Sequence, residues 1–249
     1  MSDFLVNTSN TLTQGTDSGD FILANTALGS TVYGAAGDDI ISAGGAINGV
    51  NAIFNGGQGT DTISLTAGVA TLTVAKAVGG GGNDLLILDA PAATNSTIHG
   101  GGGADTLTFS AGTYGTTTIN GNGGHDFVSG SAMTFSSTLL GLGGGNDTLN
   151  LVSASATNAA TIAAGGGNDF ISGSIASGSG WRIEGDTVGD TTFYGNDTIN
   201  LSGTLIGVSS LVQGGGGADI ITYATGLANG TGSTINGNAG GDSITLGET

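Results

Sequence analysis

Aspartate recurs along this chain at nearly constant intervals, each time after a glycine-rich loop and before a branched aliphatic residue. Three copies are almost identical: residues 56–63 are GGQGTDTI, residues 100–107 are GGGGADTL and residues 214–221 are GGGGADII. With looser copies included, eleven aspartates hold the equivalent position: Asp20, Asp39, Asp61, Asp84, Asp105, Asp126, Asp147, Asp169, Asp197, Asp219 and Asp242. The successive intervals are 19, 22, 23, 21, 21, 21, 22, 28, 22 and 23 residues. Charges that served only solubility would not keep this spacing, so we expect the carboxylates to share one structural role.

The chemistry open to this pattern is the binding of a hard divalent cation through oxygen. Calcium takes about 6–8 oxygen ligands, and backbone carbonyls serve as well as carboxylates. Glycine adopts positive φ at no steric cost, which lets several successive carbonyls of one loop point inward. Besides the aspartates, the candidate ligands are therefore the loop glycines Gly57, Gly59, Gly80, Gly82, Gly101, Gly103, Gly124, Gly145, Gly167, Gly215 and Gly217.

The composition agrees with a cation-binding role and excludes several others. The chain of 249 residues has 52 glycines, one proline and no cysteine, and its 19 acidic residues face only two fixed cations, Lys76 and Arg182. No basic patch can form, so nucleic acid is not an expected partner. No apolar run reaches the ~18 residues of a membrane helix, so no transmembrane segment is expected. A hydrophobic fraction of 37% argues against a solvated disordered chain.

The residues that flank each aspartate predict the elements that position it. Two positions after every aspartate stands Ile, Leu or Val, and four positions after it an apolar residue recurs in most copies. This alternation is typical of a strand with one buried face. A second apolar site lies seven residues before the aspartate, as in Val32, Phe54 and Ile98, and ends another short strand. We therefore predict an all-β parallel β-roll, or β-solenoid, of about eleven coils. Coils stacked at ~4.8 Å would form a rod about 50 Å long.

We expect one domain over residues 1–249, because no shift in composition or linker divides the chain. Residues 1–14 would form an N-terminal edge or cap and residues 15–246 the repeats. The 28-residue interval places an insertion at residues 185–194, which carries Asp186 and Asp190 beside Trp181 and Arg182. We interpret it as a tolerated surface loop.

The frame G-G-x-G-x-D followed by an aliphatic residue resembles the calcium-binding nonapeptide of the RTX (repeats-in-toxin) family, and the resemblance spans Asp20 to Leu246. It implies that two aspartates of consecutive coils bracket each Ca²⁺ ion and that glycine carbonyls complete the shell. Typical RTX rolls carry two nonapeptides per coil, whereas this chain has one. We therefore predict one calcium column along a single edge, with about ten ions in the ten gaps between eleven loops. By analogy with parallel crossover connections, the solenoid is expected to be right-handed.

Some copies depart from the pattern and make individual sites uncertain. The loop before Asp20 has only Gly15 and Gly19, and the loop before Asp197 is interrupted. The loop at residues 121–124 has Asn122 in place of the second glycine. Which of these degenerate sites hold calcium stays open at this point.

Catalysis is not expected. The two histidines, His99 and His125, occupy positions that hold other polar or small residues in neighbouring repeats, and no nucleophile is paired with a base. The repeats fill the chain and leave no room for an effector domain. We predict a secreted calcium-binding structural protein at the bacterial cell surface or in the extracellular matrix. It would fold on calcium and associate with itself, head-to-tail or laterally, into a filament or surface layer.

Three alternatives remain open. The chain could be an adhesin or matrix module that binds surface glycan or protein through its variable loops or the insertion near Trp181. It could be a detached RTX secretion module of a larger parent. An ice-binding β-roll is the weakest alternative, because the outward threonines do not form one regular array. The RTX resemblance also implies type I secretion.

Overall fold

The computed structural model describes residues 2–7, 9–24, 29–43, 48–66, 71–89, 92–178, 180–186, 194–203, 209–224 and 232–247. Every regular element in these ranges is a β-strand, and every pairing between strands is parallel. The strands form two sheets of 17 and 11 strands, named sheet A and sheet B here. No helix in the described ranges is long and apolar enough to cross a membrane.

Sheet B contains one strand from each coil, and each strand leads into a glycine loop. Its strands are β2 (Leu12–Gln14), β4 (Thr31–Ala36), β7 (Ile53–Gln58), β10 (Lys76–Gly81), β13 (Thr97–Gly102), β16 (Thr118–Gly123), β19 (Thr138–Gly144), β21 (Ala160–Gly166), β23 (Trp181–Glu184), β25 (Leu211–Gly216) and β27 (Thr234–Ala239).

Sheet A contains the strands that follow each aspartate, together with short strands on the opposite turn. Its strands are β1 (Asp3–Val6), β3 (Phe21–Ala24), β5 (Ile40–Ala43), β6 (Asn48–Val50), β8 (Thr62–Leu65), β9 (Thr71–Thr73), β11 (Leu85–Leu88), β12 (Ala92–Thr94), β14 (Thr106–Phe109), β15 (Gly112–Gly115), β17 (Phe127–Ser131), β18 (Met133–Ser136), β20 (Thr148–Ala156), β22 (Phe170–Gly178), β24 (Thr198–Gly203), β26 (Ile220–Tyr223) and β28 (Ser243–Leu246).

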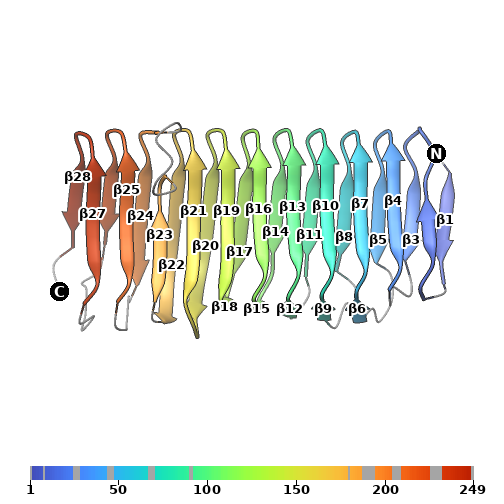
Figure 1. Ribbon diagram of the computed structural model, residues 1–249, viewed down its shortest axis with the longest axis horizontal. Helices are drawn as coiled ribbons and strands as arrows, with labels where there is room; N and C mark the ends of the chain where they lie inside the picture. Colours follow the sequence, from blue (N-terminus) through green and yellow to red (C-terminus); the bar gives the residue numbers. More distant parts are fainter. Residues whose placement is uncertain are drawn as a thin grey trace.

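The two sheets lie face to face along an elongated rod (Figure 1). In this view the sheet B strands lie in front and point upward, the sheet A strands lie behind and point downward, and the chain advances from right to left. This path is a right-handed coil. The predicted all-β parallel solenoid with a single glycine–aspartate turn per coil is therefore confirmed.

The core consists of aliphatic ladders between the sheets. Residues two positions after the aspartates, from Ile22 to Ile221, are at most 1% exposed, while Ile244 in the last strand is 43% exposed. Alternation along each strand places these side chains inward, and stacking brings equivalent residues into register, as in Leu86 with Leu107 and Ile63. The end strand β28 lacks this cover on one side, which explains the exposure of Ile244.

The turn opposite the aspartates differs from the variable loop that the sequence predicts. Strands β6, β9, β12, β15 and β18 stack there as a third short strand, which continues in the second halves of β20 and β22. Inward residues such as Tyr114 and Phe135 are buried, and their rings pack in sequence from Phe109 to Trp181. The strands form because the turn buries one or two apolar side chains in the coils from β9 to β22, even though the residue types vary.

The N-terminal segment extends both sheets by one rung. Strand β1 pairs in parallel with β3, and β2 pairs with β4. Phe4 packs against the core, and Val6 is 2% exposed. The segment thus covers the edge of the first repeat, while the division of the chain into one domain with a cap stays a prediction.

Candidate metal-binding edge

The eleven aspartates form one continuous column along the edge where sheet B turns into sheet A. In each of the ten gaps, the backbone N–H of one aspartate donates to Oδ1 of the aspartate in the next coil, at 2.7–3.1 Å. This ladder fixes the carboxylates at one height in every coil. The structure therefore brings all eleven predicted aspartates together in the order expected from their spacing.

The second carboxylate oxygen is left without a partner in most coils. The side chains of the column from Asp20 to Asp219 are at most 3% exposed, so water does not replace the missing bonds. Among the described residues, nine buried Oδ2 atoms have no hydrogen-bond partner: those of Asp39, Asp61, Asp84, Asp105, Asp126, Asp147, Asp169, Asp197 and Asp219. A buried polar atom without a partner is costly, and a buried anion more so. These atoms are therefore strong candidates for cation ligation.

Burial disfavours the ionised state of these carboxylates. It raises the pKa of Asp61, Asp105 and Asp197 to about 7, of Asp147 to about 6 and of Asp169 to about 8. Repulsion between neighbours along the column adds to the increase, against the opposing effect of the N–H bond that each accepts. A divalent cation between coils would offset both effects.

All eleven glycines proposed as ligands adopt positive φ, between 117° and 141°. Their carbonyl oxygens lie between coils: a Cβ added to Gly101 or Gly103 would lie 2.0 or 2.1 Å from the carbonyl oxygen of Gly80 or Gly82. The residue between two such glycines behaves differently. A Cβ on Gly102 would meet nothing within 4 Å, and its carbonyl accepts the N–H of Gly82 at 2.7 Å.

The glycine that opens the loop makes room for the carboxylate. A Cβ on Gly100 would lie 2.3 Å from Oδ2 of Asp105, and most coils repeat this contact. Leu142 and Ala164 hold the equivalent place in two coils, where they are fully buried. Glycine is thus not required in every coil at this position, nor at the first positive-φ position, where Ala35, Asn122 and Asn238 replace it.

The two ends of the column differ from its middle. Oδ2 of Asp20 accepts the N–H of Thr16 at 2.6 Å and its hydroxyl at 2.9 Å, which lowers the pKa of this aspartate. Its Oδ1 accepts the N–H of Ser2. Asp242 lies in the last loop and is only half-buried. Both carboxylate oxygens of Asp20 therefore have hydrogen-bond partners, so this aspartate needs a cation less than those in the middle of the column.

A second ladder, which the sequence did not predict, runs beside the column. The residue before the aspartate accepts the backbone N–H of its counterpart in the next coil, as from Asn168 to Asn146 at 2.8 Å and from Asn196 to Asn168 at 2.6 Å. His125 takes part through Nδ1, which accepts the N–H of Asn146 at 2.7 Å. The frequent Asn at this position was the signal for this ladder.

The donor set fits calcium. Within the described ranges no three His, Asp or Glu side chains converge on one point. A cation between coils would therefore have at most two carboxylates and would take its other ligands from backbone carbonyls. Calcium accepts such an all-oxygen set, with carbonyls beside carboxylates.

Comparison with known families agrees with this geometry. Four segments, residues 30–49, 93–114, 111–132 and 158–175, match the RTX calcium-binding nonapeptide repeat, and they contain Asp39, Asp105, Asp126 and Asp169. Neither a curated protein nor a solved structure matches the chain. The chain therefore carries RTX calcium-binding nonapeptide repeats on a parallel β-solenoid.

Proposed function

We propose that the chain is a secreted structural protein that folds on calcium and assembles with copies of itself into an extracellular filament or surface layer. The observation that carries the calcium part is the row of nine buried carboxylate oxygens without partners. Asp39 to Asp219 would hold the ions in one column, together with the glycine carbonyls of the loops. Bound calcium would supply the positive charge that this edge lacks.

Folding should depend on calcium because the column is unfavourable without it. Each coil places a carboxylate in a desolvated site next to two others, and 52 glycines make the chain costly to order. Ion binding would offset both costs, as in other proteins in which metal binding is coupled to folding. About ten ions, one per gap, would balance the charge of −17.

Self-assembly is supported by the distribution of charge. From β3 to β28 no strand of sheet A contains Asp, Glu, Lys, Arg or His. Its outer face instead presents Ser, Thr and Asn with exposed Ile40, Phe127, Phe170 and Ile220, which are 37–50% exposed. Two like-charged copies can approach on this face without repulsion, and β-sheets stack face to face at ~10 Å. A second copy is therefore the occupant that we assign to the outer face of sheet A.

End-to-end contacts offer a second route to polymers. Within the described ranges β28 pairs only with β26, and its side chains Ile244 and Leu246 are 43% and 51% exposed. A strand edge that pairs with a second copy can generate filaments through repeated head-to-tail contacts. An extracellular location fits the matched repeats, which are typical of secreted proteins. Type I export belongs to the same proposal.

Two measurements test the proposal. Far-UV circular dichroism should change from disordered to β-rich on addition of calcium and reverse with chelator. Electron microscopy of the calcium-loaded protein should reveal filaments or sheets that disperse in chelator. A chain that keeps its β-structure without divalent cations would contradict calcium-dependent folding. A chain that stays monomeric when loaded with calcium would contradict self-assembly.

A glycan-binding adhesin is a second candidate, favoured by the outward Phe127 and Phe170, two coils apart on sheet A. The alternative through Trp181 has less support, because this side chain is 1% exposed and packs on Phe135. Most of the insertion, residues 187–193, lies outside the described residues. Glycan-array binding that is lost in a Phe127→Ser, Phe170→Ser variant would favour the adhesin.

A further inference from the structure

The coil with the insertion contains a buried carboxylate that the aspartate column does not include. Asp186 follows Gly185, and its N–H donates to the carbonyl of Gly214 at 2.9 Å. A Cβ on Gly215 would lie 2.5 Å from Cβ of Asp186. Asp186 thus takes the register of the second loop glycine, at the point where the insertion begins.

Oδ2 of Asp186 accepts backbone hydrogen bonds at the place where the insertion interrupts the regular pattern of bonds between coils. In regular coils the N–H of the last loop glycine donates to a carbonyl of the next coil, as from Gly103 to Gly123 at 2.8 Å. Here the N–H of Gly195 donates to Oδ2 of Asp186 at 3.4 Å, and the N–H of Gly216 donates to the same atom at 2.8 Å. A carboxylate is not needed for this task, since any buried acceptor of this shape would serve.

The other carboxylate oxygen of Asp186, Oδ1, accepts no hydrogen bond of this kind. The side chain is 3% exposed, and Oδ1 is buried and has no hydrogen-bond partner among the described residues. Burial is the main cause of the raised pKa of Asp169, Asp197 and Asp219, and the negative charge of Asp186 adds to it, which agrees with a place beside the column. Three consecutive coils therefore contain four unpartnered carboxylate oxygens, one more than any regular stretch of the column.

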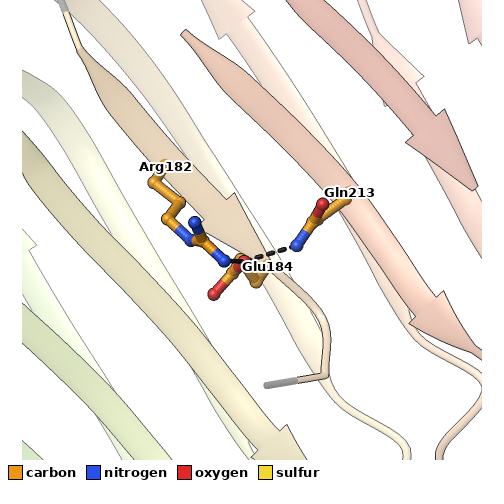
Figure 2. A network of polar contacts seen from close by, with 3 residues as sticks. All are labelled: Arg182, Glu184 and Gln213. Carbon is orange, nitrogen blue, oxygen red and sulfur yellow. Dashed lines mark hydrogen bonds and ion pairs between the residues drawn. The ribbon is translucent and has the colours of Figure 1, made fainter. Parts of the chain in front are cut away.

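The neighbouring acid does not compete for this role. Glu184 lies two residues earlier on β23 and forms an ion pair with Arg182, while the amide of Gln213 donates to the same oxygen (Figure 2). The charge of Glu184 is thus compensated on the face of sheet B. Among the described residues, no cation contacts Asp186.

We propose that Oδ1 of Asp186 is a calcium ligand in the insertion coil, paired with Asp197. The inference rests on the proposed calcium binding and adds a residue specific to this coil. Calcium affinity depends on the number of charged oxygen ligands, so loss of the Asp186 charge should weaken binding in this coil. Backbone carbonyls would complete the shell as in the other gaps.

The test is a calcium titration of the full chain in competition with a chromophoric chelator. Asp186→Asn keeps an oxygen that accepts the N–H of Gly216 and removes only the charge. We expect the affinity for the calcium ion of this coil to weaken about tenfold or more. The matched control is Asp89→Asn, which removes an equal charge from an exposed residue outside the column and should leave calcium binding unchanged.

Circular dichroism in saturating calcium checks that each variant folds, and Asp186→Glu provides a second arm that keeps the charge. This variant should bind calcium with the affinity of the wild type. An Asp186→Asn protein within twofold of the wild type, or equal loss in the Asn and Glu variants, would overturn the inference. If the wild-type chain binds no calcium at all, the proposed function and this inference both fail, whereas the outcomes above leave the proposed function intact.

Discussion

At the scale of single residues, each of the nine inner aspartates of the column, from Asp39 to Asp219, meets two opposing demands. Its Oδ1 is satisfied by a backbone N–H of the preceding coil, while its Oδ2 is buried with nothing to bind. The first contact helps to define the fold, and the second makes the fold costly at neutral pH. A variant that keeps the Oδ1 hydrogen bond but removes the charge should therefore lower stability in calcium and raise stability without calcium.

Asp105→Asn is such a variant, because the amide oxygen can still accept the N–H of Asp84. In calcium we expect a lower Tm, since one charged ligand is lost. In calcium-free solution at pH 8 we expect the variant to fold at a lower concentration of a stabilising osmolyte than the wild type, since it buries no charge. Circular dichroism measures both, with Asp89→Asn as the control, and destabilisation under both conditions would contradict the argument.

The raised pKa values also predict how the calcium-free protein responds to pH. An aspartate has an ordinary pKa near 3.8, and in the folded chain Asp147, Asp105 and Asp169 have values of about 6, 7 and 8. The folded state therefore binds protons more tightly than the unfolded state, and stability is lost as the pH increases through this range.

We thus expect calcium-depleted protein to be more folded at pH 5 than at pH 8, as measured by circular dichroism. With saturating calcium the order should reverse, because protons compete with the ion for the same oxygens. A calcium-free chain that gains structure from pH 5 to pH 8 would show that the carboxylates are not held in desolvated sites.

At the scale of elements, the glycine loop contains adjacent positions with different steric requirements. Gly103 has a φ of 121°, and a Cβ there would lie 2.1 Å from the carbonyl of Gly82. The preceding residue, Gly102, does not have a positive φ, and a Cβ added there would meet no atom within 4 Å. A side chain at Gly103 would force the coils apart and disturb the carbonyls of the gap.

Gly103→Ala should therefore lower the stability of the calcium-loaded protein by more than about 1 kcal/mol, from strain alone. Gly102→Ala is the matched neighbour and should be nearly neutral. Thermal unfolding in calcium measures both variants. Equal effects would mean that backbone entropy, rather than contact between coils, determines the requirement for glycine.

The elements also mark where inference from sequence succeeded and where it stopped. The strands beside the aspartate were predictable because Ile63, Leu86 and Leu107 repeat in register, and Ile63 and Leu107 alternate with polar residues. The third strand on the opposite turn was missed because its inward residues, such as Leu72, Ala93 and Tyr114, differ in size and type. Only the stacking of neighbouring turns reveals that they occupy one position.

At the scale of the whole molecule, charge is separated from the flat face that would carry assembly. Most of the acidic residues gather along the glycine–aspartate edge, while the strands of sheet A after β1 carry none. Interfaces are disfavoured when like charges meet across them. Charge introduced on sheet A should therefore prevent lateral contact, whereas the same change on sheet B should not.

The pair Thr106→Lys and Thr148→Lys, both outward and half-buried on sheet A, should abolish lateral assembly in calcium. The matched pair Thr118→Lys and Thr161→Lys on sheet B should leave it intact. Electron microscopy and light scattering compare the two proteins, with circular dichroism as the check of folding. Assembly that survives in the first pair would assign the contact to the ends of the rod.

The sequence by itself determined the coil, its period and the register of the eleven aspartates, because identical short repeats must stack in identical ways. It also identified eleven loop glycines that adopt positive φ, because glycine takes this conformation at no steric cost. The tertiary structure decided which carboxylate oxygen remains free, that the variable turn forms strands, and that Asp186 is buried beside the column. These features depend on contacts between residues about twenty positions apart in the sequence, and for Asp186 on contacts across an insertion. The local sequence does not show which residues make these contacts.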